Sequence, residues 1–224
     1  MPTEETIAAW ALTGRQRAYM KLKCVVDWLL ALVALILLSP VLLVIVLAIK
    51  REDGGPVLFT QKRVARGGAY FSIYKFRTMR LDTPHDMPTH LLRDPEQYIT
   101  RVGRVLRRTS LDELPQLWNI LRGELAVSGP RPALWNQDDL IALRRQYGVE
   151  QIRPGLTGWA QIHGRDELEI EKKAALDAYY LRHLGPIIDL KCFFGTFLAV
   201  FRQDGVVEGG TGAGRQREGK GPEA

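Results

Sequence analysis

Two adjacent carboxylates, Asp112 and Glu113, are the residues of this sequence best suited to chemistry. Ser110 precedes them and, with Glu113 three positions later, forms the pattern of a helix-capping box. This pattern predicts a helix that starts at Ser110, whose N-terminal partial charge would keep both carboxylates ionised. Such a charged first turn is common in helices that have no catalytic role. The surrounding sequence therefore has to distinguish a reactive pair from a simple cap.

The segment from residue 62 to residue 108 is strongly basic, with eleven lysines and arginines. They are Lys62, Arg63, Arg66, Lys75, Arg77, Arg80, Arg93, Arg101, Arg104, Arg107 and Arg108. Apolar residues between them must point into the core, so the basic groups should gather on one side, where they suit phosphates. Beside them an ionised Asp112 can attack a phosphoryl group, and Glu113 can hold Mg²⁺. The alternative is a solvated face that only touches anionic lipid.

An uncharged apolar run, WLLALVALILLSPVLLVIVLAI, extends from residue 28 to residue 49. As a straight helix it would reach roughly 33 Å, enough to cross a bilayer. Pro40 cannot donate to the carbonyl of Ile36, so a kink is expected there. The Ser39 hydroxyl is the nearest group that can satisfy the freed carbonyl.

Basic residues flank this run at both ends, at 15, 17, 21 and 23 before it and at 50, 51, 62 and 63 after it. A spanning helix usually shows an asymmetry instead. A re-entrant helix over residues 24–50, broken at Ser39-Pro40, explains the proline and the symmetric charge together. An ordinary proline-kinked span is the alternative. Residues 1–23 are expected to form an interfacial segment, with a short helix from Ile7 to Tyr19.

Residues 51–203 are expected to form a compact cytosolic domain of mixed α/β (α+β) class. Strand patterns at 57–61 and 70–76 suit a hairpin that turns at 66–68. Helical patterns follow at 99–108, from 110 onward, at 137–147, at 167–184 and at 187–201. The last is apolar on one face and suits the membrane interface, the core or a homodimer. A doubly wound fold is disfavoured because no Gly-rich strand-to-helix turn is present. Residues 204–224 are rich in glycine and charged residues, a composition that predicts a disordered tail.

The composition narrows the class of protein further. The chain has 224 residues and a net charge of +6, which suits phosphate-rich substrates or an anionic membrane. The four histidines lack zinc-binding spacing, no phosphate-binding loop is present, and no nucleic-acid-binding motif accompanies the basic residues. The two cysteines, Cys24 and Cys192, fit a reducing, cytosol-facing environment.

Several longer motifs occur in a fixed order along the chain. They are KFRTM at 75–79, TRVGRVLRRTSLDELPQLWNIL at 100–121, GPRP at 129–132, RPGLTGWAQIHGR at 153–165, D-x-Y-Y at 177–180 and DLK at 189–191. Over about residues 15–203, this set closely resembles the bacterial sugar transferases, the monotopic polyprenyl-phosphate phosphoglycosyl transferases. The size resembles the minimal catalytic form of that family.

The resemblance implies transfer of a phospho-sugar from a UDP-sugar to undecaprenyl phosphate, with release of UMP. It implies a covalent phosphosugar-aspartate intermediate, a requirement for Mg²⁺, and a re-entrant helix that keeps both of its ends in the bacterial cytosol. Matched onto this chain, Asp112 is the nucleophile and Glu113 the carboxylate associated with the metal. Substrate phosphates would lie against the basic residues Lys75, Arg77, Arg108, Arg131 and Arg153. Such an enzyme acts at the cytoplasmic face of the inner membrane, at the first membrane step of glycoconjugate assembly.

The chain departs from the family pattern at two places. GELAVSG at 123–129 replaces the frequent GDMSLVG, and His163 stands where Asn is frequent, so the fit of the sugar could differ. Two other functions remain open: a non-catalytic adaptor that binds anionic lipid, and a glycosyl transferase that releases UDP instead of UMP. The sequence does not identify the sugar.

Overall fold

The computed structural model describes residues 11–83, 95–164 and 168–202, and its longest element is helix α2, Gly14–Asp53. The helix begins at a capping box, because the Thr13 side chain accepts from Gln16 N–H while the Gln16 side chain accepts from Thr13 N–H. It ends at Gly54, which has a left-handed backbone with φ 70°. Of the described residues, only α2 is long and apolar enough to cross a membrane, by length and composition.

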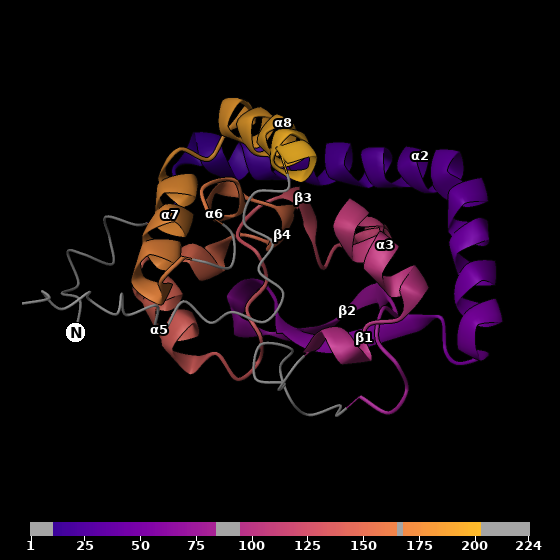
Figure 1. Ribbon diagram of the computed structural model, residues 1–224. Helices are drawn as coiled ribbons and strands as arrows, with labels where there is room; N and C mark the ends of the chain where they lie inside the picture. The colour runs from indigo at the N-terminus through magenta and orange to yellow at the C-terminus, as the bar shows by residue number, and fades with distance from the viewer. Residues whose placement is uncertain (1–10, 84–94, 165–167, 203–224) are drawn as a thin grey trace, which may run out of the picture.

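Helix α2 bends without being interrupted. In Figure 1 its first part runs across the top of the molecule and its second part turns sharply downward. Pro40 lies within the helix, and the Ser39 hydroxyl donates to the Ile36 carbonyl at 2.8 Å. The predicted replacement hydrogen bond is therefore confirmed. Whether the bent helix re-enters or spans a bilayer stays a prediction.

The N-terminal boundary of α2 differs from expectation. A short helix was expected from Ile7 to Tyr19, separate from the apolar run, but α2 starts at Gly14 and continues straight into that run. Residues 7–10 lie outside the described part of the chain. The segment 15–23, which carries four basic residues, therefore continues into the apolar helix. No helix-breaking residue separates this segment from the apolar run.

A β-hairpin follows α2, as the sequence predicts. Strands β1, Leu58–Val64, and β2, Tyr70–Phe76, pair antiparallel from Leu58 opposite Phe76 to Val64 opposite Tyr70. The short helix η1, Arg66–Gly68, makes the turn, with Gly67 in the left-handed region at φ 71°. Buried residues of β2 pack with Ala31 of α2 and with helix α4, Gln116–Leu121, so the hairpin supports one face of α2.

The region that carries the two carboxylates differs from the predicted capped helix. After η3, Pro95–Tyr98, and α3, Arg101–Thr109, Ser110 adopts a left-handed conformation with φ 56° and makes no side-chain capping bond. A short 3₁₀ turn, η4, Leu111–Glu113, follows before helix α4, Gln116–Leu121. The prediction that Ser110 caps a helix was wrong, because Ser110 terminates α3 instead. Its backbone N–H bonds back to the Arg107 carbonyl, and the chain turns sharply.

A second small sheet was not predicted. Strands β3, Ala126–Ser128, and β4, Gly155–Thr157, pair in parallel, with Ala126 opposite Gly155. Each has only three residues, too few for a period-two pattern to stand out in the sequence. With two separate two-stranded sheets among the described residues, the fold is a mixed α and β arrangement, and no doubly wound sheet forms there.

The C-terminal half of the described chain is mostly helical. Its elements are α5, Asp138–Gln146; η5, Val149–Gln151; α6, Trp159–Ile162; α7, Ile170–Arg182; and α8, Pro186–Arg202. Helix α8 lies near the first part of α2 (Figure 1), where Lys23 and Asp189 form an ion pair of 2.6 Å. Large apolar side chains of α2 and α8 remain exposed, including Leu37 at 71% and Ile187 at 71%. The predicted disordered tail, 204–224, lies outside the described residues.

Candidate active site

Three separate segments bring four of the predicted residues together. Strand β2 supplies Lys75 near its end, the sharp turn after α3 presents Asp112 and Glu113, and the loop after β3 supplies Arg131. These four residues are called the carboxylate cluster below. All four side chains are mostly buried, with exposed fractions between 13% and 34%. The cluster is therefore a partly desolvated group of opposite charges.

Within the cluster Glu113 is the fully paired carboxylate. Its Oε1 accepts from Lys75 Nζ at 2.8 Å and from Arg131 Nη2 at 2.7 Å, and its Oε2 lies 3.4 Å from Arg131 Nη1. Burial by itself would raise the pKa of Glu113, but the charges of Arg131 and Lys75 outweigh it and hold the pKa well below its usual range. Glu113 is therefore ionised at neutral pH.

Asp112 is the less engaged carboxylate. Its Oδ2 lies 3.9 Å from Lys75 Nζ, beyond hydrogen-bonding distance. Burial raises the pKa of Asp112, and the neighbouring charge of Glu113 adds to this, while Lys75, Arg107 and Arg131 pull it down. The two carboxylates thus have different environments: Glu113 is held by two cations, and Asp112 has an oxygen that is free of close cation pairing. This asymmetry suits one binding carboxylate and one nucleophile.

The loop that carries Arg131 is held rigidly from behind. Arg144 Nη1 donates to the Arg131 carbonyl at 2.8 Å, and Arg144 is itself paired with the buried Asp177 at 2.6 Å. Gly129 lies so close to β4 that an added Cβ would come within 2.7 Å of the Arg153 carbonyl oxygen. Glycine at position 129 therefore permits the close approach of the two backbone segments, and this approach fixes the start of the loop.

The structure does not bring the remaining predicted arginines into the cluster. Arg77 is almost fully buried and pairs with Asp53 at the end of α2, so its guanidinium is already neutralised away from the two carboxylates. Arg108 is exposed at the end of α3. Arg153 Nη1 lies 3.1 Å from the Cys24 sulfur on α2. Ser39 and Pro40 form the bend of α2, outside the cluster.

Arg107 is the residue that the sequence interpretation missed. Its charge lowers the pKa of Asp112, and its Nε donates to Thr78 Oγ1 at 2.9 Å. A helical-wheel argument would have found it, because Arg107 lies four residues after the buried Gly103 and so shares its inward face. Arg108 falls on the neighbouring, exposed face of α3.

The acidic residues fit a magnesium ion that also binds a substrate phosphate. Among residues 11–83, 95–164 and 168–202, no three His, Cys, Asp or Glu side chains gather as a ready-made metal site. Mg²⁺ is commonly held by one or two carboxylates together with substrate phosphates and water, and the adjacent Asp112 and Glu113 meet that requirement. His163 is not part of this set, because its ring packs on Trp159 with centroids 4.3 Å apart.

Comparisons with known proteins point to one family. The model of the family described as bacterial sugar transferase matches residues 18–203. The chain is 38% identical over 187 residues to the sugar transferase EpsL of Bacillus subtilis (strain 168), covering 84% of this chain and 91% of that protein. It is 36% identical over 188 residues to the exopolysaccharide production protein ExoY of Sinorhizobium fredii, covering 78% and 83%.

A third relative has a more specific name. The chain is 39% identical over 188 residues to the UDP-glucose:undecaprenyl-phosphate glucose-1-phosphate transferase of Escherichia coli (strain K12). The match covers 81% of this chain but 40% of that longer protein. The family match at residues 18–203 includes all three segments of the carboxylate cluster.

Proposed function

Because the chain belongs to the bacterial sugar transferase family and is a membrane-associated phosphoglycosyl transferase, we propose that it transfers a sugar 1-phosphate from a UDP-sugar to undecaprenyl phosphate. The reaction releases UMP and yields a lipid-linked diphosphosugar. The observation that carries the proposal is the asymmetry of the carboxylate cluster, in which Glu113 is held by two cations and Asp112 is not. Membership of this enzyme family disfavours the alternative function of a non-catalytic adaptor that binds anionic lipid.

In the first step, a carboxylate oxygen of Asp112 attacks the phosphorus that bears the sugar. A new bond forms between this oxygen and the phosphorus, while the bond from that phosphorus to the bridging oxygen breaks. The electron pair leaves with UMP, and the sugar phosphate remains on Asp112 as an acyl phosphate. Partial burial suits this role, because a poorly solvated carboxylate is more nucleophilic than a hydrated one.

In the second step, a phosphate oxygen of undecaprenyl phosphate attacks the same phosphorus. The bond to Asp112 breaks, the carboxylate is regenerated, and the lipid diphosphosugar leaves. Both steps pass through a phosphoryl group with negative oxygens. Burial raises the pKa of Asp112, and the charges of Lys75, Arg107 and Arg131 act against this rise, so the same charges can also stabilise these oxygens.

Glu113 is proposed to hold Mg²⁺, together with the substrate diphosphate. When bound, the ion would neutralise charge on the diphosphate and on the departing UMP. Glu113 stays ionised through its contacts with Lys75 and Arg131, as metal binding requires. Arg108 and Arg153 are proposed to bind phosphates from outside the carboxylate cluster.

We further propose that α2 is re-entrant and that the catalytic part lies on the cytoplasmic face of the inner membrane. Both arms of the bent helix contact the same folded unit: Lys23 pairs with Asp189 of α8, and Asp53 pairs with Arg77 after β2. A helix that crossed the bilayer would place its ends on opposite sides, so one compact unit could not bind both. Single cysteines near residues 15 and 55, with Cys24 and Cys192 replaced, should both be labelled from the cytosol. Labelling from opposite sides would restore the spanning helix.

The assignment of Asp112 is tested by the identity of the products. The wild-type protein, given a panel of UDP-sugars and Mg²⁺, should release UMP and gain the mass of a sugar phosphate. Asp112→Asn should do neither, while Glu113→Gln should keep a slow UMP release that responds to Mg²⁺ concentration. Release of UDP by the wild type would indicate an ordinary glycosyl transferase. Unchanged turnover of Asp112→Asn would rule out Asp112 as the nucleophile.

A further inference from the structure

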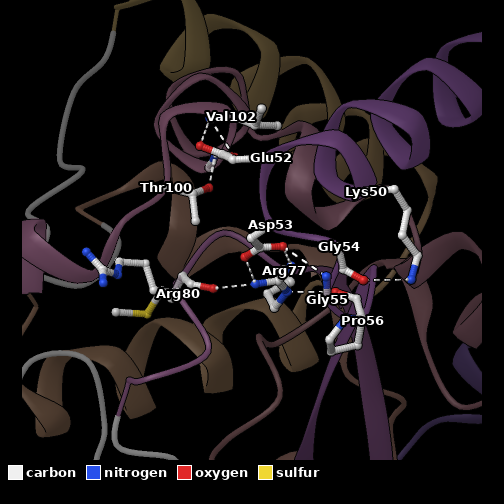
Figure 2. A network of polar contacts seen from close by, with 12 residues as sticks. Lys50, Glu52, Asp53, Gly54, Gly55, Pro56, Arg77, Arg80, Thr100 and Val102 are labelled. Carbon is white, nitrogen blue, oxygen red and sulfur yellow. Dashed lines mark hydrogen bonds and ion pairs between the residues drawn. The ribbon is translucent and has the colours of Figure 1, made fainter.

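The C-terminal end of α2 binds two of the segments that build the active site. Figure 2 shows this network, in which Glu52 reaches the start of α3 while Asp53 reaches Arg77. We propose that Glu52 and Asp53 are positioning residues for the transfer reaction, which hold Asp112 and Lys75 at the distance that the chemistry needs. The inference rests on the proposed function at Asp112. We call Glu52, Asp53 and Arg77 the helix-end clamp.

Glu52 satisfies the free backbone groups at the N-terminus of α3. Its Oε1 accepts from Arg101 N–H at 2.7 Å, and its Oε2 accepts from Val102 N–H at 3.2 Å. Thr100 Oγ1 accepts from the next amide, Gly103 N–H, at 2.8 Å. These contacts bind three of the four N–H groups that a helix start leaves unpaired. The negative charge of Glu52 also interacts favourably with the positive N-terminal end of the α3 dipole.

Asp53 holds Arg77 through both of its carboxylate oxygens. Arg77 Nη1 donates to Asp53 Oδ2 at 2.5 Å, and Arg77 Nη2 forms a second, shorter contact with Asp53 Oδ1. The same guanidinium donates to the carbonyls of Pro56 at 2.6 Å and Met79 at 3.2 Å. Gly55 leaves the space for this arrangement, because a Cβ there would lie 2.9 Å from Arg77 Nη2. Four acceptor contacts therefore fix one side chain.

The two held segments are joined to each other at Thr78, the residue after Arg77. The Thr78 carbonyl accepts from Thr100 N–H at 3.0 Å, and Thr78 Oγ1 accepts from Arg107. Gly103 packs directly against this backbone, since a Cβ at Gly103 would lie 2.1 Å from the Thr78 carbonyl oxygen. The start of α3, the end of β2 and the end of α2 therefore form one connected body.

This body carries part of the carboxylate cluster at its far side. Lys75 is two residues before Arg77 on the same chain, and Asp112 follows α3 after the left-handed turn at Ser110. The clamp binds different partners from the cluster: Glu52 binds the start of α3, and Asp53 binds the Arg77 side chain. We therefore expect its effect on the reaction to pass through the position of the reacting groups. A displacement of about 1 Å at reacting groups can cost about 10²-fold in rate.

The test uses full-length protein in detergent with Glu52→Gln and Asp53→Asn, which keep shape and remove charge. Asp82→Asn is the matched control, because Asp82 forms a nearby ion pair with Arg80 in which both side chains are 59% exposed. UMP release is measured with UDP-glucose and UDP-galactose well below the unfolding temperature. We expect kcat to fall about 10- to 100-fold in each clamp variant, with the KM for the donor changed by less than about twofold. Asp82→Asn should match the wild type.

An unchanged kcat in both clamp variants, or a rise in KM alone, would overturn the inference. The double variant Asp53→Asn with Arg77→Lys should lose no more kcat than the worse single variant, since both act through one contact. Additive losses would contradict this. A wild-type protein that releases no UMP from any UDP-sugar would instead refute the proposed function.

Hydrogen exchange tests the structural part of the inference, that the clamp holds α3 and the turn after it, even in that case. Removing the Glu52 charge should raise amide exchange in α3 and in residues 110–113, whereas Asp82→Asn should not. Faster exchange confined to residues 50–57 would show that the clamp holds only the end of α2 and has no positioning role.

Discussion

The carboxylate cluster and the helix-end clamp are built from the same kinds of residue but differ in how completely they are paired. Lys75 and Arg77 stand two residues apart in one motif, and each binds an acidic side chain. In the clamp, Arg77 is 9% exposed and all of its donor groups meet nearby acceptors. In the cluster, Arg131 is 34% exposed, and the Lys75 ammonium lies 3.9 Å from Asp112, beyond hydrogen-bonding distance. A guanidinium whose donors are all hydrogen-bonded suits a structural role that holds segments together. Charged groups that are only partly paired can still interact with a substrate.

This difference helps to distinguish a structural charge, such as Arg77, from a charge available to a substrate, such as Lys75, within one short motif. A buried ion pair whose partners are all satisfied loses stability when one member is removed, since the other is left buried and unpaired. A partly exposed cluster loses little stability but loses the interactions that it would make with the reacting phosphate. Variants of the cluster should therefore lose activity with little loss of stability, whereas variants of the clamp should lose stability together with their smaller loss of kcat.

The largest effect is expected at Asp112. Asp112→Asn should lower UMP release by about 10³-fold or more, since the nucleophile is removed while the fold is kept. The unfolding temperature should stay close to that of the wild type. A matching loss of activity in Asp53→Asn would erase the distinction between the two regions.

Lys75 should give the next largest loss of activity. Lys75→Met should lower kcat by about 10²-fold, because one charge that faces the developing negative oxygens is gone. Stability should change little, since Glu113 keeps its contacts with Arg131. Steady-state UMP release and thermal unfolding, measured on the same preparation, check both halves of this expectation. A strong loss of stability without loss of kcat would assign Lys75 to the structural class.

Arg77→Met should lose stability, unlike Lys75→Met. We expect the free energy of unfolding to fall by about 2 kcal/mol, because a buried guanidinium is removed and the carbonyl oxygens of Pro56 and Met79 lose their donor, while Asp53 itself is exposed to water. Thermal unfolding in detergent measures this, with the exposed pair Arg80→Met as control, for which less than about 1 kcal/mol is expected. Equal losses at both positions would mean that the clamp contributes no more than a surface ion pair.

The smallest effect is a pH dependence of stability. The hydrogen bond from Arg77 holds the pKa of Asp53 below its usual range. A carboxyl with a lowered folded pKa stabilises the fold above its unfolded pKa of about 3.9, and this stabilisation is lost as the pH falls through the folded value. Asp53→Asn should therefore flatten the fall in unfolding temperature below about pH 4. Parallel curves of unfolding temperature against pH for the wild type and the variant would contradict a stabilising ion pair between Asp53 and Arg77.

Much of the local structure could be predicted from the sequence. The hairpin of β1 and β2, the helices α3, α5, α7 and α8, and the hydrogen bond from Ser39 to Ile36 follow from periodicity and proline chemistry. The parallel pair β3 and β4 could not be predicted, because three-residue strands carry no period and their partners lie far apart in the chain.

The candidate site was predicted in part, for a similar reason. Lys75, Asp112, Glu113 and Arg131 meet as expected from the motifs, although the turn at Ser110 replaced the predicted helix start. Arg77 was expected beside them on grounds of charge and motif alone. Its partner Asp53 lies 24 residues earlier, and nothing local in the sequence connects the two.

By itself, the sequence determined the apolar helix with its proline, the order of the short elements, and the presence of acidic and basic residues suited to phosphate chemistry. These follow from local backbone preference and side-chain type, which act over a few residues. Only the tertiary structure decided which cation meets which carboxylate, that the charge of Arg107 acts on the pKa of Asp112, and that Arg77 binds the end of α2. Electrostatic pairing depends on distance in space, and distances between remote segments are set only when the chain folds.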